Sequence, residues 1–403
     1  MKKIKITTIG GGNGQSNLLD GMNNVFGDKI EISSIVSMSD DGRTTGELMK
    51  LFDTELGLHL PPPGDLRRCL FSLSKSKFKQ YFKLTFEYTF LNEKKISDFS
   101  IFDLFNQVHK EILFFGTNTE FKEDIKDFVE NSNGKIFEFL NKKAKNIFDF
   151  KLPLNASLKG HKFGNILMAS LYYNFDKDYD KMLDFMHNLL KVDASVIPVT
   201  TKKAFIKAIL GNGEIVETQD KISNEANYNS GIADLELMDS SIDAVHHKKV
   251  SKAVTQADFI IIGPGDLFTS IISNFIISGV QSSIRQTNAK IIYIGNNTNK
   301  GGETMGLTQL DFVNKIERFL GKRIDYFIAN NKKPTLSECE LEAFKNDISV
   351  KGGDYLFVSP GEKRELERRK IKLIESDLLD EKSFYKHSKV KTLSVLKKIF
   401  FDK

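Results

Sequence analysis

Five short apolar segments of the chain each end abruptly in a loop of glycine and small polar residues. The segments are rich in isoleucine and other β-branched residues and are bounded by breakers, which is typical of buried strands in a parallel sheet. They span residues 4–9, 30–38, 259–262, 291–294 and 324–329. Helical patterns follow two of them, at 16–25 and 267–277. This alternation predicts β-loop-α units and therefore an α/β fold.

One long segment interrupts this pattern. Residues 78–158 are rich in Phe, Lys, Asp and Glu at helix-like spacing and contain few turn signals. We expect a helical insertion there, between a first part of the core at 1–77 and the remainder of the core at 159–350.

Smaller additions are predicted further along the chain. Apolar alternation around the glycines at 211 and 213 indicates a β-hairpin, inside a small β-rich section at about 196–240. Residues 351–403 should form a C-terminal strand, at 355–358, and helices. The lysine-rich stretch 387–401 has the pattern of an amphipathic helix. Such a helix either docks on the core by its apolar stripe or binds a membrane surface.

Composition narrows the class of protein. A chain of 403 residues with 40% apolar and 28% charged residues can bury a large core. Its net charge of +5 is spread over 58 basic and 53 acidic residues, which argues against nucleic acid as a partner. Two distant cysteines, Cys69 and Cys339, give neither a disulfide framework nor metal-ligand spacing. With no signal peptide and no 18-residue apolar window, we expect a cytoplasmic protein without a membrane span.

The loop after the first predicted strand has the sequence GGGNG, at 10–14, and a helical pattern follows it. Glycines let backbone N–H groups approach an anion closely, and a helix N-terminus adds partial positive charge. Gly11, Gly12, Asn13 and Gly14 are therefore candidates for binding phosphate. The loop is not a Walker A motif, and Gln15 stands where a full GxGxxG motif has its third glycine. A merely tight turn is the alternative.

The loop after the second predicted strand places Asp40, Asp41 and Arg43 together. Adjacent carboxylates on a loop often only cap a helix. Their position beside the glycine loop instead favours contact with ligand hydroxyls, binding of Mg²⁺ beside a diphosphate, or action as a base.

Two further motifs lie between the second strand and the β-rich section. In PPGDLRRCL, at 62–70, we expect Asp65 to be a helix N-cap with Arg67 and Arg68 in the first turn, and Asp65 and Arg67 are candidate ligand-binding residues. Cations there oppose the helix dipole, so they need a phosphate or an ion pair with Asp40 or Asp41. In HKFGN, at 161–165, the histidine is more often structural than catalytic.

Two later loops repeat the chemistry of the first. GPGDLFTS, at 263–270, offers glycines, hydroxyls and a helix start after a strand, and NNTNKGGET, at 296–304, offers amides that could read a base or a sugar. Because the ligand of an open parallel sheet binds beyond the carboxyl ends of its strands, all these loops should meet at one edge. The candidates in the two loops are Gly263, Gly265, Phe268, Thr269 and Asn296.

These six motifs, in this order, resemble the family of the YvcK-type gluconeogenesis factors and the CofD 2-phospho-L-lactate transferases. That family has GGGTG, DDGGSSG, PPGDIRNCL, HxxGN, GPGSLYTS and NxMTxxGET. The resemblance extends from about residue 4 to 330 and is closer to the YvcK side. It implies a Rossmann-like, doubly wound, mainly parallel core that binds a nucleoside diphosphate or nucleotide sugar.

The resemblance also implies roles for individual residues. Gly12, Asn13, Gly14 and Thr269 would hold phosphates and Asn296 would seat the nucleotide. Asp40 and Asp41 would face the sugar or acceptor, and Asn165 would line the pocket.

Two functions follow from these roles. The first is a regulatory protein that binds UDP-N-acetylglucosamine and controls central carbon metabolism and cell-wall growth. The alternative is a CofD-like transferase that moves a phosphoester group from a nucleotide-activated donor, with Mg²⁺ at Asp40 and Asp41. A scaffold that binds a partner through 78–158 is a third class, and homo-oligomerisation is left open.

The chain departs from the family pattern at several ligand positions. Asn13 replaces Thr, Phe268 replaces Tyr, and Asp266 replaces a Ser in a loop expected to meet phosphate. A carboxylate at position 266 would repel that phosphate.

Overall fold

The computed structural model describes residues 2–116, 147–224, 231–347 and 351–402. The chain forms two compact units. The first, here called the sheet unit, consists of Met1–Asp40 and Ala194–Lys403, and the second, the helical unit, of Asp41–Asp193. The helical unit is thus inserted in the chain between the second and third strands of the sheet.

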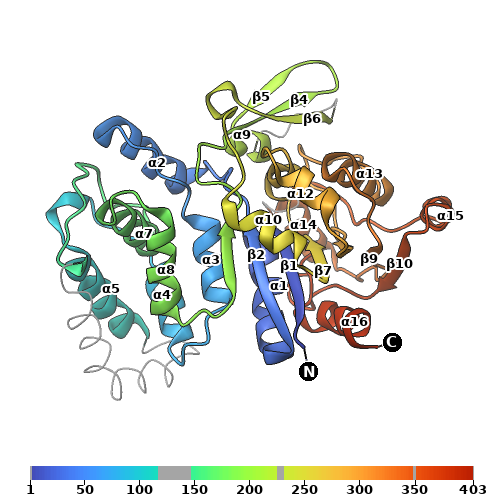
Figure 1. Cartoon of the computed structure of the whole chain (residues 1–403), viewed down its shortest axis with the longest axis horizontal. Helices are drawn as coiled ribbons and strands as arrows, with labels where there is room; N and C mark the ends of the chain where they lie inside the picture. Colours follow the sequence, from blue (N-terminus) through green and yellow to red (C-terminus); the bar gives the residue numbers. More distant parts are fainter. Residues whose placement is uncertain (1, 117–146, 225–230, 348–350, 403) are drawn as a thin grey trace. The chain divides into compact units, whose positions relative to one another are not determined.

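The sheet unit is built on a seven-stranded sheet in which every pairing is parallel (Figure 1). The strand order is β3-β2-β1-β7-β8-β9-β10, so the chain builds outward from β1 in one direction and then from β7 in the other. This is the order of a doubly wound, Rossmann-like sheet. The strands are β1 (Ile4–Gly10), β2 (Ile30–Val36), β3 (Ser195–Pro198), β7 (Phe259–Ile262), β8 (Lys290–Ile294), β9 (Tyr326–Asn330) and β10 (Lys372–Ser376).

The five predicted apolar segments are confirmed as β1, β2, β7, β8 and β9. The later strands are nearly continuous apolar runs because the sheet buries them on both faces, as in β8, where only Lys290 is exposed. β1 and β2 also bury small polar side chains, such as Thr8 and Ser34. The predicted strand at 355–358 is wrong. Tyr355 makes only an isolated bridge to Thr298, and the C-terminal strand is β10, which extends the sheet beside β9.

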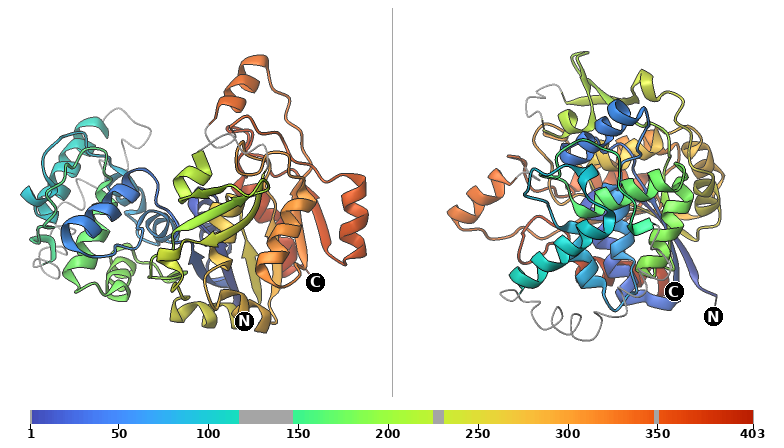
Figure 2. Two further views of the ribbon diagram at one scale, coloured as in Figure 1. Left: turned by 90° about the horizontal axis from the view of Figure 1, so that it is seen from above. Right: turned by 90° about the vertical axis from the view of Figure 1, so that its left-hand side faces the viewer.

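Helices of the sheet unit follow its strands. They are α1 (Gly12–Phe26), α9 (Gln219–Asn224), α10 (Lys248–Thr255), a π-helical turn (Leu267–Ile272) that continues into α11 (Ser273–Phe275), α12 (Val280–Gln286), α13 (Gln309–Leu320), α14 (Glu338–Asn346), α15 (Pro360–Arg368) and α16 (Lys389–Phe401). The predicted C-terminal amphipathic helix is confirmed as α16. It packs on α1, where Phe400 and Phe26 meet edge to face. Figure 2 shows α14, in orange-red, standing out from the rest of the unit.

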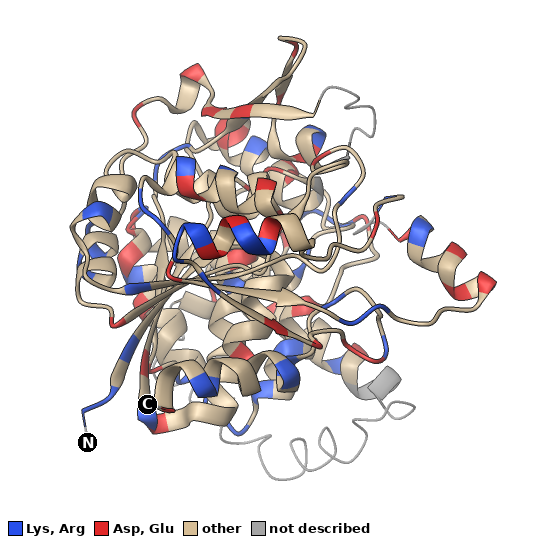
Figure 3. Ribbon diagram, turned by 90° about the vertical axis from the view of Figure 1, so that its right-hand side faces the viewer, with Lys and Arg blue, Asp and Glu red and all other residues tan. Residues whose placement is uncertain are grey.

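The sheet unit also contains a small antiparallel sheet of order β5-β4-β6. Its strands are β4 (Ile206–Leu210), β5 (Ile215–Glu217) and β6 (Ile232–Leu237). The hairpin predicted around Gly211 and Gly213 is confirmed, because β4 and β5 pair across that turn. Positions of basic and acidic residues are interspersed along the ribbon in Figure 3, in keeping with the small net charge.

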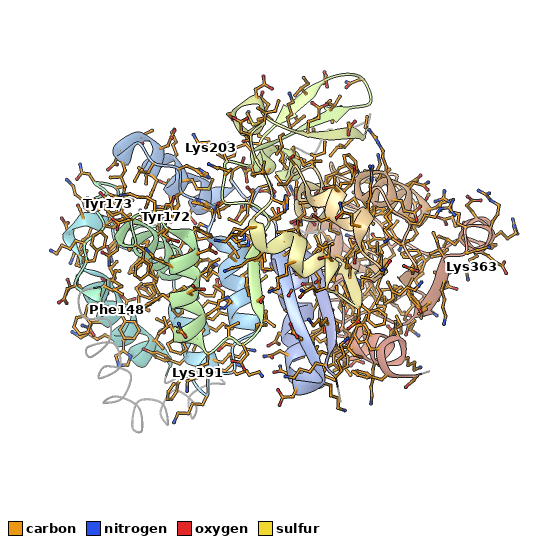
Figure 4. All side chains as sticks on the ribbon, in the orientation of Figure 1. Phe148, Tyr172, Tyr173, Lys191, Lys203 and Lys363 are labelled. Atoms are coloured by element: carbon orange, nitrogen blue, oxygen red, sulfur yellow. The ribbon has the colours of Figure 1, made fainter. Side chains whose placement is uncertain are left out.

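The helical unit contains α2 (Arg43–Leu56), α3 (Gly64–Ser72), α4 (Lys79–Glu87), α5 (Ile101–Gly116), α7 (Phe163–Asn174) and α8 (Tyr179–Leu190). Rings of α4 and α5 pack on Phe163 of α7, with Phe86 at 5.8 Å and Phe105 at 6.2 Å between centroids. The described part of the expected insertion thus shares its core with α7. The compact unit begins at Asp41, and residues 117–146 lie outside the described chain. Tyr172 of α7, labelled in Figure 4, donates its hydroxyl to the His59 carbonyl at 3.1 Å.

Candidate functional site

The candidate site of the sheet unit lies where the strand order reverses. β1 pairs with β2 on one side and with β7 on the other, and Ile9 lies opposite Ile262. Each of β1 and β7 is followed by a glycine-rich loop and then by a helical segment. In doubly wound sheets this reversal opens a crevice beyond the carboxyl ends of the strands, which is where ligands bind.

The loops after β1 and β7 lie in direct contact. Gly14 has no room for a side chain, because a Cβ there would collide with the carbonyl of Pro264. A Cβ on Gly265 would lie 3.5 Å from the Gly11 carbonyl oxygen. Gly12 has φ +66°, a conformation that favours glycine, and a Cβ there would meet only Ser270 Oγ, at 3.6 Å. The loop is therefore tightly packed against its neighbours at Gly14, whereas at Gly12 there is space beside the backbone.

Gln15 has a structural role. Its side chain is fully buried and its Nε2 donates to Thr8 Oγ1, Ser34 Oγ and the Ile35 carbonyl, at 2.9–3.1 Å. This amide ties the first turn of α1 to β1 and β2. The residue that breaks the GxGxxG pattern therefore holds the loop in place.

The loop after β2 joins the same cluster. Ser37 donates its backbone N–H to the Gly10 carbonyl at 2.8 Å, and Ser39 Oγ donates to the Thr269 carbonyl at 3.0 Å. Asp40 follows directly and is the last residue of this segment of the sheet unit. The structure therefore brings Asp40 to the edge that carries the glycine loops.

Asn296, in the loop after β8, is anchored to the loop after β7. Its Nδ2 donates to the Gly265 carbonyl at 3.0 Å, and its own carbonyl accepts from Gln309 Nε2 at 2.9 Å. The half-buried His387 contacts the neighbouring Gly295 carbonyl through Nε2 at 2.9 Å, and desolvation lowers the pKa of this histidine to about 4. Asn296 is thus part of the framework that shapes the Gly263–Gly265 turn.

Glu303 occupies donors that the sequence assigned to phosphate. Its Oε1 accepts the backbone N–H of Phe268 at 2.9 Å, and the N–H and hydroxyl of Thr269 at 3.1 and 3.3 Å. The carboxylate is 1% exposed. Burial, together with the charge of Asp266, raises its pKa, against the pull of Lys300 and the two N–H groups. Sequence reasoning missed Glu303, although it lies in the glycine-rich NNTNKGGET stretch.

In the helical unit, Asp65 lies inside the first turn of α3, so the prediction that it is the N-cap is wrong. The N-cap is Pro63, and Asp65 forms an ion pair with Arg68. The carboxylate stays near the positive end of the helix dipole, where it offsets the cations that follow.

Arg67 and Asn165, both predicted to bind ligand, bind each other. The Arg67 side chain is 1% exposed, and its Nε donates to Asn165 Oδ1 at 3.0 Å. Its Nη1 donates to the Phe86 carbonyl and to Glu87. Burial lowers the pKa of Arg67, while Glu87 opposes that shift. The guanidinium thus links α3, α4 and α7 into one core.

The DDGRTTG and HKFGN motifs meet within the helical unit. A Cβ on Gly160 would lie 3.5 Å from Thr44 of α2, and His161 Nε2 lies 3.8 Å from Glu47 Oε2. Burial lowers the pKa of His161, while Glu47 and the Thr44 backbone oppose the shift. Arg43 begins α2, and its side chain lies outside the described part.

In the ranges that the structure describes, no group of three or more His, Cys, Asp or Glu side chains is arranged to hold a metal ion. Mg²⁺ at Asp40 and Asp41 therefore stays a prediction, in which the phosphates of a ligand would complete the coordination. Among the described helices, none has the length and apolar character that crossing a membrane requires.

Comparisons with known proteins agree with this architecture. A family model described as 2-phospho-L-lactate transferase CofD matches residues 6–379. A Thermotoga maritima protein named "Putative gluconeogenesis factor" is 28% identical over 346 residues, which cover 86% of this chain and 84% of the relative. A Clostridium acetobutylicum protein of the same name is 26% identical over 406 residues, covering 97% and 73%.

Solved structures show the same fold. Two crystal structures of a Bacillus halodurans protein, described as a UPF0052 family member, match with a TM-score of 0.70 at 22% identity, covering 98% of this chain and 99% of that chain. This identity shows the fold alone, whereas the family model spans most of the sequence. The chain therefore belongs to the CofD family.

Proposed function

We propose that the sheet unit binds a nucleoside diphosphate or a nucleotide sugar at the carboxyl ends of β1 and β7, and that UDP-N-acetylglucosamine is the leading ligand. The observation that carries this proposal is the contact between two glycine-rich loops, Gly14 against Pro264 and Gly265 near Gly11, at the reversal of strand order. Backbone N–H groups at such a place, with a helix N-terminus behind them, suit a diphosphate.

The backbone donors that Glu303 occupies bear on where the phosphates bind. Because Glu303 takes the N–H groups of Phe268 and Thr269, the start of the Leu267–Ile272 turn already holds a carboxylate. The loop of Gly11, Gly12 and Asn13 at the start of α1 is then the anion site of choice. Its roomy position at Gly12 leaves space for an oxyanion.

The proposal makes this protein a cytoplasmic regulator that senses a nucleotide sugar, in line with the gluconeogenesis-factor name of its relatives. In this function Asp40 and Asp41 accept hydrogen bonds from sugar hydroxyls. Asp40 is well supported for that role, because Ser37 and Ser39 anchor its loop to the glycine edge.

The second candidate is a phosphoester transfer reaction of the CofD type, favoured by the family match. There Asp40 and Asp41 would bind Mg²⁺ or activate the acceptor hydroxyl. A bound Mg²⁺ would neutralise developing charge on the phosphates.

Isothermal titration calorimetry tests the first proposal. The full-length protein is titrated with UDP-N-acetylglucosamine, UDP, GDP and ADP, with and without Mg²⁺. We expect a uridine ligand to bind, with the sugar adding affinity over UDP. No heat from any of these ligands at millimolar concentration would refute nucleotide binding. Mg²⁺-dependent consumption of a nucleotide-activated phosphoester would instead select the transferase.

A further inference from the structure

Lys300, which is not among the sequence-predicted site residues, lies in a charged cluster beside the glycine loops. Its ammonium donates to Asp266 Oδ2 and to Ser223 Oγ, both at 2.8 Å. Its side chain is only 12% exposed, and Nζ lies 3.6 Å from Glu303 Oε2. A lysine is rarely buried to this extent unless its charge is compensated.

The position of this ammonium follows from the loops that carry it. Asp266 comes directly after Gly265, whose carbonyl accepts from Asn296 in the same loop as Lys300. The lysine is therefore held next to the turn that touches the glycine loop after β1. At such a position its charge would act on any anion bound there.

The contacts of the ammonium leave capacity for a ligand. An ammonium has three hydrogens, and in the described part of the chain two of them have hydrogen-bond partners, Asp266 and Ser223. The second charged neighbour, Glu303, keeps its Oε2 3.6 Å from Nζ, an ion-pair distance, while its other oxygen, Oε1, accepts from Phe268 and Thr269. Asp266, the partner that a ligand can replace, is also the more exposed carboxylate, at 40%.

The charges around Asp266 also leave Lys300 as a donor for a bound anion. A carboxylate at position 266 would by itself repel a phosphate, as the sequence suggests. The ion pair with Lys300 cancels that charge, and Glu303 removes two backbone donors from the same edge. Lys300 can replace the backbone donors that Glu303 occupies, because a lysine has a flexible side chain and a compact ammonium that binds phosphate well.

We propose that Lys300 binds a phosphate group of the nucleotide, and that Asp266 holds its ammonium in place until the ligand takes it over. This inference rests on the proposed nucleotide binding by the sheet unit. In this proposal Asp266 competes with the nucleotide phosphate for the ammonium of Lys300. Removing Lys300 should therefore weaken nucleotide binding, and removing Asp266 should strengthen it.

The test measures UDP affinity by calorimetry for the wild type and three variants. Lys300→Met should weaken UDP binding about ten- to hundredfold, the effect of losing one charge-assisted contact. Lys300→Arg should recover part of that loss. Asp266→Ser should strengthen binding several-fold, because the ammonium no longer has to leave a carboxylate.

A control lysine is available on β8, the strand that precedes the loop of Lys300. Lys290, at the amino end of β8, pairs with Asp325 at 2.7 Å, at the opposite edge of the sheet. Lys290→Met should leave UDP affinity unchanged. Thermal melts of all variants check folding, and the Asp266→Ser result keeps the inference testable if Lys300→Met fails to fold.

The outcomes distinguish failure of nucleotide binding from failure of the role given to Lys300. A wild type that binds no UDP or other nucleoside diphosphate overturns the proposed function. A wild type that binds, with Lys300→Met equal to it, overturns this inference alone. Weakened UDP binding by Asp266→Ser also overturns it, because substitution of either residue would weaken binding if the ion pair were purely structural.

Discussion

Removal of the Glu87 charge should destabilise the helical unit far more than removal of an exposed carboxylate. Glu87→Gln keeps the size and one acceptor oxygen but takes away the carboxylate that pairs with Arg67. Arg67 is 1% exposed, and its other hydrogen-bond partners in the described chain, Asn165 and the Phe86 carbonyl, are neutral. The variant therefore leaves a buried guanidinium without its ion-pair partner.

The magnitude follows from the burial of the two partners. Breaking a fully buried ion pair costs about 3–5 kcal/mol. Glu87 is 31% exposed, so solvent screens part of the interaction, and we expect about 2–3 kcal/mol. With a urea dependence of about 2 kcal/mol per molar, that lowers the unfolding midpoint by about 1 M. Glu93→Gln, which breaks the exposed pair with Lys159, is the control and should leave the midpoint unchanged.

The same pair predicts a pH dependence. Burial favours the neutral form of Glu87, but Arg67 and Lys162 outweigh it and lower its pKa from 4.5 to about 2. A depressed pKa means that the stabilisation is complete above pH 4.5 and is lost as the pH falls towards 2. Glu87→Gln should therefore show a smaller loss of stability between pH 5 and pH 3 than the wild type.

Urea unfolding followed by far-UV circular dichroism measures both effects. Hydrogen exchange of α3 and α7 assigns the change to the helical unit, since the chain has two units and its unfolding need not be two-state. An unchanged midpoint for Glu87→Gln at neutral pH, or an acid dependence equal to that of the wild type, would refute the role given to this ion pair.

Two further predictions concern the edge of the sheet unit. Gly12→Val should abolish nucleotide binding and lower the melting temperature only moderately, because its φ of +66° strains a side chain although only Ser270 Oγ lies near it. Gly14→Val should lower the melting temperature further, because its side chain collides with the Pro264 carbonyl. Calorimetry and thermal melts of the pair check this, and full affinity in Gly12→Val would place the phosphates elsewhere. Asp40→Asn should weaken nucleotide-sugar binding by one to two decades, or about 1.5–3 kcal/mol, and leave UDP affinity nearly unchanged. Equal losses for both ligands would contradict a contact with the sugar.

The strands and their loops could be predicted from sequence because the signals are local. The runs that became β7, β8 and β9 are almost entirely apolar, as expected of strands covered on both faces, and those that became β1 and β2 are mostly isoleucine and other β-branched residues. That the glycine loops lie at one edge of the sheet could also be predicted, because the carboxyl ends of parallel strands share an edge. The hairpin between β4 and β5 was predicted in the same way, from its glycine turn.

Partners of charged side chains could not be predicted, because they are distant in sequence. Arg67 meets Glu87 and Asn165, which lie 20 and 98 positions away, and these contacts exist only once α3, α4 and α7 pack. Glu303 reaches donors 34 and 35 positions upstream. Sequence showed that an arginine in the first turn of α3 needs a partner, but the candidates it offered, a phosphate, Asp40 and Asp41, included neither of these two partners.

The structure of the protein with bound UDP-N-acetylglucosamine, determined by crystallography, tests the central claim most directly. We predict that the diphosphate binds at the N-terminus of α1, with its oxygens accepting hydrogen bonds from the backbone N–H groups of Gly11, Gly12 or Asn13. Lys300 should have moved from Asp266 towards a phosphate oxygen. A diphosphate bound away from the carboxyl ends of β1 and β7 would contradict the account.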